Sequence, residues 1–155
     1  MRVLFALSAA ALVLGITSSS MARPAEATPS AEALVAARQA AFRLNLASFL
    51  TIKAAIARGD DVKTLALPSG AIAGWGRALP GLFPAGSTTP KSEALPTVWS
   101  DRAGFEAAAA AMATEAAKLN ALAKAGDSAG FAAQYAVLGG TCAACHTKYK
   151  AEEKH

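Results

Sequence analysis

Apolar residues recur along four stretches of the chain at alternating steps of three and four, a spacing that puts side chains on one face of an α-helix. The first stretch predicts a long helix over residues 31–58, with Ser30 as its N-cap and Gly59 as its end. Its inward stripe comprises Val35, Arg38, Phe42, Asn45, Phe49, Ile52 and Ile56. The two polar members of this stripe are expected either near a water-exposed end or facing something polar in the core.

The second helical stretch is the least regular of the four. Asp60 and Asp61 suit a helix start, but the proline at Pro68 interrupts the pattern, so we expect a break there and a resumed helix over residues 69–79. Residues 80–96 contain too much proline and glycine for regular structure. They predict a long crossover loop between the second and third helices.

The third and fourth helices have clearer ends. Ser100 is the expected N-cap of the third helix, Gly126 ends it, and Asp127 caps the fourth. The third inward stripe comprises Phe105, Ala109, Met112, Ala116, Leu119 and Ala123, and the fourth comprises Phe131, Tyr135, Leu138, Cys142, Cys145 and Tyr149. No stretch alternates convincingly like a strand. The pattern therefore predicts an all-α protein, an antiparallel four-helix bundle with one long crossover loop.

The N-terminus has the layout of a secretory signal. Arg2 is the charged start, residues 3–16 form an apolar run, and small residues lead up to Ala22. We predict cleavage after Ala22, which leaves residues 23–155 as one domain. The alternative is an uncleaved anchor, but a spanning helix needs roughly 20 apolar residues.

The net charge does not indicate a particular binding partner. Removing the signal takes one cation, Arg2, from 15 basic residues and nothing from 11 acidic ones, so the net charge falls from +4 to about +3. The basic residues are scattered, which argues against a nucleic-acid surface. We expect no membrane attachment after cleavage.

Residues 142–146 read Cys-Ala-Ala-Cys-His, the sequence of covalent haem c attachment. On a helix, Cys142 and Cys145 face the same side, so their thiols can add to the two vinyl groups of one haem edge. His146 then reaches the iron as an axial ligand. We predict one haem c per chain.

Two other uses of these cysteines remain open at this point. A structural zinc site needs four ligands, and His155, at the end of the chain, is the only further histidine. A thioredoxin-like redox pair would lie beside a strand of a βαβ unit. Gly139 and Gly140, just before the motif, either weaken the helix or make room for a flat macrocycle.

Beyond this motif, the chain resembles the cytochrome c′ family over residues 31–150. The most specific stretch is VLGGTCAACHTKYK at residues 137–150. Support comes from segments far apart in the sequence: PTVWSD at 96–101 with Gly104 and Phe105, LPGLFP at 79–84, and Arg38 and Gln39 with Phe42. Together these matches are far more specific than the haem motif alone.

The resemblance implies roles that the residues alone leave open. It implies a five-coordinate iron with His146 on the solvent-facing side and Phe42 covering the other side. It also implies that Arg38 and its neighbour Gln39 lie at the haem, with Arg38 near a propionate. From periodicity alone, Phe42 reads as a core side chain and Arg38 as a solvated cation. At position 150 the family often has arginine, so the role of Lys150 is open.

We therefore predict a periplasmic, high-spin haem protein that is not an enzyme. It would bind nitric oxide and related diatomics such as carbon monoxide, pass single electrons to redox partner proteins, or do both. The expected pocket is apolar and without hydrogen-bond donors. A homodimer through the first two helices is implied by the resemblance.

The alternative is a low-spin, six-coordinate electron carrier of the same fold. It needs a strong sixth ligand, and relatives of this kind use a methionine of the first helix. After signal cleavage only Met112 remains, on the third helix, where its simplest role is to fill the core. A peroxidase would need a distal histidine as acid-base group.

Overall fold

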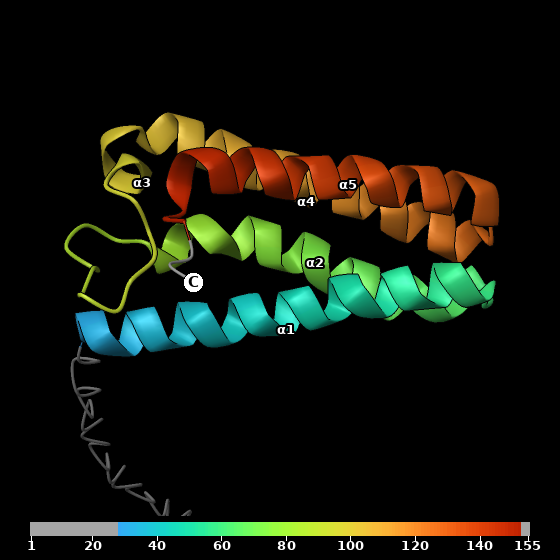
Figure 1. Ribbon diagram of the computed structural model, residues 1–155, viewed down its shortest axis with the longest axis horizontal. Helices are drawn as coiled ribbons and strands as arrows, with labels where there is room; N and C mark the ends of the chain where they lie inside the picture. Colours follow the sequence, from blue (N-terminus) through green and yellow to red (C-terminus); the bar gives the residue numbers. More distant parts are fainter. Residues whose placement is uncertain (1–27, 153–155) are drawn as a thin grey trace, which may run out of the picture.

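The computed structural model describes residues 28–152 of the chain, and it forms an antiparallel four-helix bundle (Figure 1). The four long helices are α1 (Ala31–Arg58), α2 (Ala66–Ala78), α4 (Arg102–Ala125) and α5 (Ser128–Tyr149). The shorter elements are the 3₁₀-helices η1 (Val62–Leu65) and η2 (Leu79–Leu82) and the single turn α3 (Thr97–Ser100). The predicted fold class is confirmed. The predicted signal at residues 1–22 and His155 lie outside the described residues.

Helix α1 begins and ends as its sequence predicts. Ser30 Oγ accepts a 3.2 Å hydrogen bond from the amide of Ala33, which satisfies one of the free donors of the first turn. Gly59 ends the helix in the left-handed conformation with φ of 73°, where a residue without Cβ is favoured. Val35 and Arg38, on the predicted inward stripe, are buried.

The expected break at Pro68 is wrong. The chain leaves η1 and enters α2 at Ala66, and the helix continues through Pro68. Pro68 is the third residue of α2, where an amide would have no partner within the helix, so the missing N–H costs little. Ser69 Oγ donates to Leu65 O over 2.7 Å and helps to join the two segments.

The predicted N-cap of the third long helix is also shifted by one residue. Ser100 belongs to α3, and Asp101 caps α4 by accepting a hydrogen bond from the amide of Gly104 over 3.2 Å. At the other end Gly126 is left-handed, as predicted, and Asp127 caps α5 through the amide of Gly130 over 2.9 Å.

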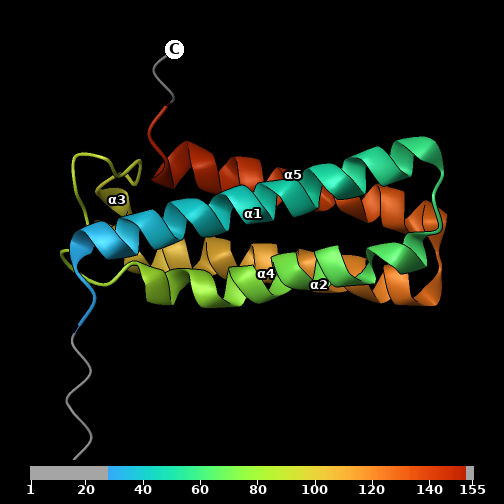
Figure 2. The ribbon, with the colours of Figure 1, turned by 90° about the horizontal axis from the view of Figure 1, so that it is seen from below.

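The core lies along the axis of the bundle, and every predicted inward residue of α4 is buried. The loop between η2 and α3 closes one end of the bundle, where α1 begins and α5 ends (Figure 2). Phe83 anchors this loop: it is buried, and its ring packs edge-on against Phe105 with centroids 5.1 Å apart. The loop therefore lies beside the end of α5 that carries the haem motif.

Candidate haem site

A cavity of about 540 Å³ lies at this end of the bundle, with walls from α1, α5 and the crossover loop. This volume lies within the usual range of cofactor and ligand sites. All the predicted site residues line it: Arg38, Gln39, Phe42, Cys142, Cys145 and His146. The fold thus brings two groups about a hundred residues apart in sequence to one apolar chamber.

The two cysteines lie on the cavity wall as free thiols. Partial burial raises the pKa of both thiols, and for Cys145 the nearby Cys142 raises the pKa further. Neither thiol therefore has the lowered pKa that is typical of a reactive redox cysteine.

The alternatives to haem attachment lack their structural context. No group of three or more histidine, cysteine, aspartate or glutamate side chains that could hold a metal ion occurs among residues 28–152. The same residues contain no β-strand beyond one isolated bridge, so the strand next to a thioredoxin-like pair is missing from the described part of the chain.

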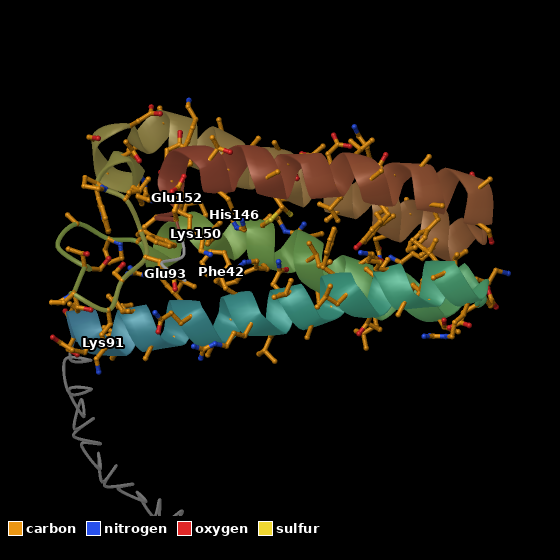
Figure 3. The ribbon with its side chains drawn as sticks, in the orientation of Figure 1. Phe42, Lys91, Glu93, His146, Lys150 and Glu152 are labelled. Carbon is orange, nitrogen blue, oxygen red and sulfur yellow. The ribbon has the colours of Figure 1, made fainter. Side chains whose placement is uncertain are left out.

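His146 and Phe42 approach the cavity from opposite helices. Figure 3 shows His146 extending from α5 and Phe42 from α1 into the space between these helices. His146 is exposed, whereas Phe42 is partly buried. The Phe42 ring is held edge-on against Trp75, with centroids 5.1 Å apart and planes at 84°. Phe42 is therefore both a packed side chain and part of the cavity wall.

Arg38 is buried, so its interpretation as a solvated cation is wrong. Its Nη1 donates to Leu82 O over 3.1 Å and to Ser87 Oγ over 2.9 Å, and its Nη2 donates to Ser87 O over 2.7 Å. The guanidinium also lies 4.2 Å from the centroid of the Phe83 ring. Burial lowers the pKa of Arg38. The described part of the chain gives it no carboxylate partner.

Gln39 ties the same loop to α1 at a second point. Its Nε2 donates to the backbone oxygen of Lys91 over 2.9 Å. Both α1 residues therefore combine contact with the cavity and anchoring of the crossover loop. Leu82, Ser87 and Lys91 accept these bonds through backbone oxygens, which carry no signal in the sequence.

Two further residues of the cavity wall were not singled out as site residues. The Asn45 side-chain oxygen is buried without a hydrogen-bond partner in residues 28–152, and Asn45 lines the cavity one turn after Phe42. Met112 of α4 also reaches the wall, so it does more than fill the core. The chamber was expected to lack hydrogen-bond donors, and Asn45 brings to its wall an amide that carries donors as well as this acceptor oxygen.

One interpretation of the paired glycines is that they make room for a macrocycle. Neither Gly139 nor Gly140 lines the cavity. A Cβ added at Gly139 would make an ordinary 3.5 Å contact with Phe49, and one at Gly140 would meet nothing within 4 Å. Their role in making room for a macrocycle stays a prediction.

The cavity fits a haem on several grounds. It is lined mainly by apolar side chains, and it presents two thiols and an imidazole from one helix. It also contains a buried cation, Arg38, that has no carboxylate partner among residues 28–152. A helical bundle with Cys-x-x-Cys-His on its cavity wall defines the class of helical c-type cytochromes. Residues 33–150 match the sequence profile of the family described as Cytochrome C′, and the chain belongs to that family.

Individual relatives show the same likeness. Cytochrome c′ of Rubrivivax gelatinosus is 49% identical over 59 residues, which cover 38% of this chain and 46% of the relative. Cytochrome c-556 of Agrobacterium tumefaciens (strain B2A) is 36% identical over 100 residues, covering 63% of this chain and 80% of the relative. The match thus spans about half the length of the first relative.

Among solved structures, a ferrous variant of cytochrome c prime from Alcaligenes xylosoxidans with bound nitric oxide superposes with a TM-score of 0.74. It is 26% identical, and the match covers 82% of this chain and all of that one. The fold of the bundle is therefore shared along the whole of that structure.

Proposed function

We propose that this protein is a periplasmic haem protein that carries one haem c and binds small neutral diatomics, above all nitric oxide. The observation that carries the proposal is the chamber between α1 and α5, where Cys142, Cys145 and His146 share a wall and Phe42 approaches from the facing helix. Membership of the cytochrome c′ family supports it.

Cys142 and Cys145 would hold the haem through thioether bonds, and His146 would ligate the iron. The three-residue spacing puts both thiols on one face of α5, and the raised pKa of each thiol keeps it protonated before attachment. The bound haem supplies an iron that takes up one electron or one diatomic molecule.

Phe42 is proposed as the cover of the opposite face. A phenyl ring offers no lone pair, so it leaves the iron five-coordinate and guards the sixth position by its bulk. Its edge-on contact with Trp75 limits how far it can swing away. Such a cover disfavours dioxygen, hinders carbon monoxide and leaves nitric oxide as the preferred ligand. Nitric oxide is the ligand bound in the related Alcaligenes xylosoxidans variant.

Arg38 and Gln39 would lie near the haem propionates. The buried charge of Arg38 supports this placement, because an uncompensated cation in an apolar seam is costly and a propionate would neutralise it. The protein would also pass single electrons to redox partner proteins. We expect no enzymatic acid-base chemistry.

A homodimer is the proposed assembly, with a second copy covering α1. Three leucines on this helix are strongly exposed: Leu44, Leu46 and Leu50. By length and composition alone α1 could cross a membrane, and only 11% of its most apolar window is buried within the bundle. Because export and cleavage at Ala22 would leave a periplasmic protein, we assign this apolar face to a second chain. Sedimentation of wild type and Leu50→Glu tests it, because Leu50 is exposed and does not line the cavity. A monomeric variant is expected, and a monomeric wild type contradicts the proposal.

One observation favours a second candidate function, the low-spin electron carrier. Met112 is buried on the cavity wall, and a thioether is a suitable sixth ligand. Met112→Leu separates the two functions, because this volume-conserving change should cost less than about 1.5 kcal/mol. An unchanged high-spin spectrum supports the open site, whereas conversion from low to high spin identifies Met112 as a ligand.

The direct test uses optical and electron paramagnetic resonance spectra of the purified mature protein in both oxidation states, followed by titration with nitric oxide. High-spin spectra and nitric oxide binding are expected. Cys142→Ser with Cys145→Ser should lose covalent haem, whereas His155→Ala should change nothing. Low-spin spectra in both oxidation states would contradict the five-coordinate proposal.

A further inference from the structure

Helix α5 ends without the glycine cap that terminates α1 and α4. Its C-cap is Lys150 in an extended conformation, with φ of −115° and ψ of 134°. The last carbonyls of a helix have no partner within it, so they need donors from elsewhere. These carbonyls belong to the turn that directly follows His146.

The donors come from the end of the crossover loop. Thr97 Oγ1 donates to Lys148 O over 2.6 Å, and the amide of Leu95 donates to Tyr149 O over 3.0 Å. In return, the amide of Ala151 donates to the backbone oxygen of Glu93 over 2.8 Å. We refer to residues 93–97 together with residues 148–151 as the clasp.

A backbone bridge and an ion pair reinforce the clasp. Ala94 and Lys150 form an antiparallel bridge, and Lys150 Nζ lies 3.5 Å from Glu93 Oε2. Figure 3 shows Glu93, Lys150 and His146 near the same end of the bundle, and all three line the cavity. This ion pair is partly exposed and adds little energy by itself, but it joins the two segments of the clasp at the cavity wall.

A buried contact fixes the same turn to α4. Tyr149 is 4% exposed, and its hydroxyl donates to Asp101 Oδ2 over 2.8 Å. The Tyr149 ring packs edge-on against Phe105, with centroids 5.4 Å apart. The rotation of α5 about its axis is therefore set one turn after His146.

We propose that the clasp and the Tyr149–Asp101 contact position His146 toward the haem iron. Thr97 Oγ1 and the Leu95 amide donate to carbonyls of this turn, and Asp101 accepts a hydrogen bond from the Tyr149 hydroxyl, so the position and orientation of the imidazole are restrained. Arg38 and Gln39 hold the other part of the same loop on α1, so a single loop links both walls of the cavity. This inference rests on the proposed ligation of iron by His146.

The test compares Thr97→Val and Tyr149→Phe with the control Thr147→Val. Each change keeps the shape of the side chain and removes one hydroxyl. Thr147 Oγ1 donates only within α5, to Ala143 O over 3.0 Å, so the control leaves the clasp intact. The first readout is the iron–histidine stretching band of the ferrous protein in resonance Raman spectra. The second is hydrogen exchange at the amides of Leu95 and Ala151.

Both clasp variants should show a broader iron–histidine band at lower frequency, and Thr97→Val should lose about tenfold or more of the protection at the Leu95 and Ala151 amides. Thr147→Val should match the wild type in both readouts. An unchanged band in both clasp variants would overturn the inference. A wild type without any iron–histidine band would instead contradict the ligation by His146, so the two failures are distinguishable.

Discussion

The hydroxyl of Tyr149 donates a 2.8 Å hydrogen bond to the carboxylate of Asp101 and so joins the end of α5 to the start of α4. The same carboxylate caps α4 through the amide of Gly104. One aspartate thus serves a helix start and a tertiary contact. The bond requires a protonated tyrosine and an ionised aspartate, which gives it two pH limits.

The stability of the protein should depend on pH through this pair. The hydrogen bond from Tyr149 lowers the pKa of Asp101 below 3.8, so its contribution is present above pH 3.8 and is lost as the pH falls through the lowered pKa. Burial, and then the bond to Asp101, raises the pKa of Tyr149 from 10.0 to about 12. The hydroxyl of Tyr149 loses its proton at a lower pH in the unfolded chain than in the folded protein. The free energy of unfolding should therefore fall as the pH rises from 10 to about 12.

Thermal unfolding of wild type and Tyr149→Phe at a series of pH values checks this window. The difference in melting temperature should be constant from about pH 5 to pH 9 and shrink on both sides. Tyr135→Phe is the matched control, because its hydroxyl donates to a backbone oxygen, that of Phe49, over 3.2 Å. This control should show no acidic limit. A pH-independent difference for Tyr149→Phe would contradict the pairing.

Arg38→Gln should destabilise the protein by about 2 to 4 kcal/mol, because hydrogen bonds to a buried charge are worth roughly 1.5 to 3 kcal/mol each. The variant leaves Leu82 O and Ser87 O without their donor. Denaturant unfolding of the haem protein measures the loss. Gln39→Ala is the control, since it removes one exposed bond to the loop and should cost less than about 1 kcal/mol. Equal losses of stability in the two variants would mean that the burial of Arg38 does not strengthen its hydrogen bonds.

The helix ends show which parts of the fold the sequence could predict. Ser30, Gly59, Gly126 and Asp127 act within one turn of the chain, so their residue types suffice to place the boundaries. The prediction of Ser100 as the N-cap of α4 was wrong because its neighbour Asp101 is an equally good cap and also accepts a hydrogen bond from Tyr149.

The candidate site was predictable for a different reason. The haem motif and the inward stripe of α1 are side-chain patterns, and both proved to line one cavity. The anchoring of Arg38 and the clasp rely on backbone oxygens at least 44 positions away from their donors, and no residue type encodes a backbone oxygen. Asn45 was visible as a polar interruption, but nothing in the sequence showed that its oxygen would have no partner among residues 28–152.

Asn45→Leu should leave the protein as stable or raise its stability by about 1 kcal/mol, because a buried oxygen without a partner costs roughly 1 to 3 kcal/mol. Thermal unfolding of the variant measures this. The control is Asn120→Leu. The side-chain amide of Asn120 donates to Ser69 Oγ over 3.2 Å, so its loss should destabilise the protein. A loss at Asn45 as large as that at Asn120 would show that its oxygen is hydrogen-bonded in the cavity.

Phe42→Ala should open the face of the haem opposite His146. If the ring guards the sixth position, its removal should raise the affinity for carbon monoxide by about tenfold or more, equivalent to about 1.4 kcal/mol of relieved steric repulsion. Loss of the edge-on contact with Trp75 should also destabilise the bundle by about 2 to 4 kcal/mol. Carbon monoxide titration of the ferrous protein and thermal unfolding measure the two effects.

Phe49→Ala is the matched control, because Phe49 also lies on α1, lines the cavity and stacks on another aromatic ring, that of Tyr135, at 4.3 Å. It should lose similar stability without gaining affinity, since it lies two turns further along the helix. Equal gains at both positions would mean that the cavity was enlarged in general and that Phe42 does not cover the iron. A gain in carbon monoxide affinity for Phe42→Ala alone would show that Phe42 covers the iron and is more than an ordinary core side chain.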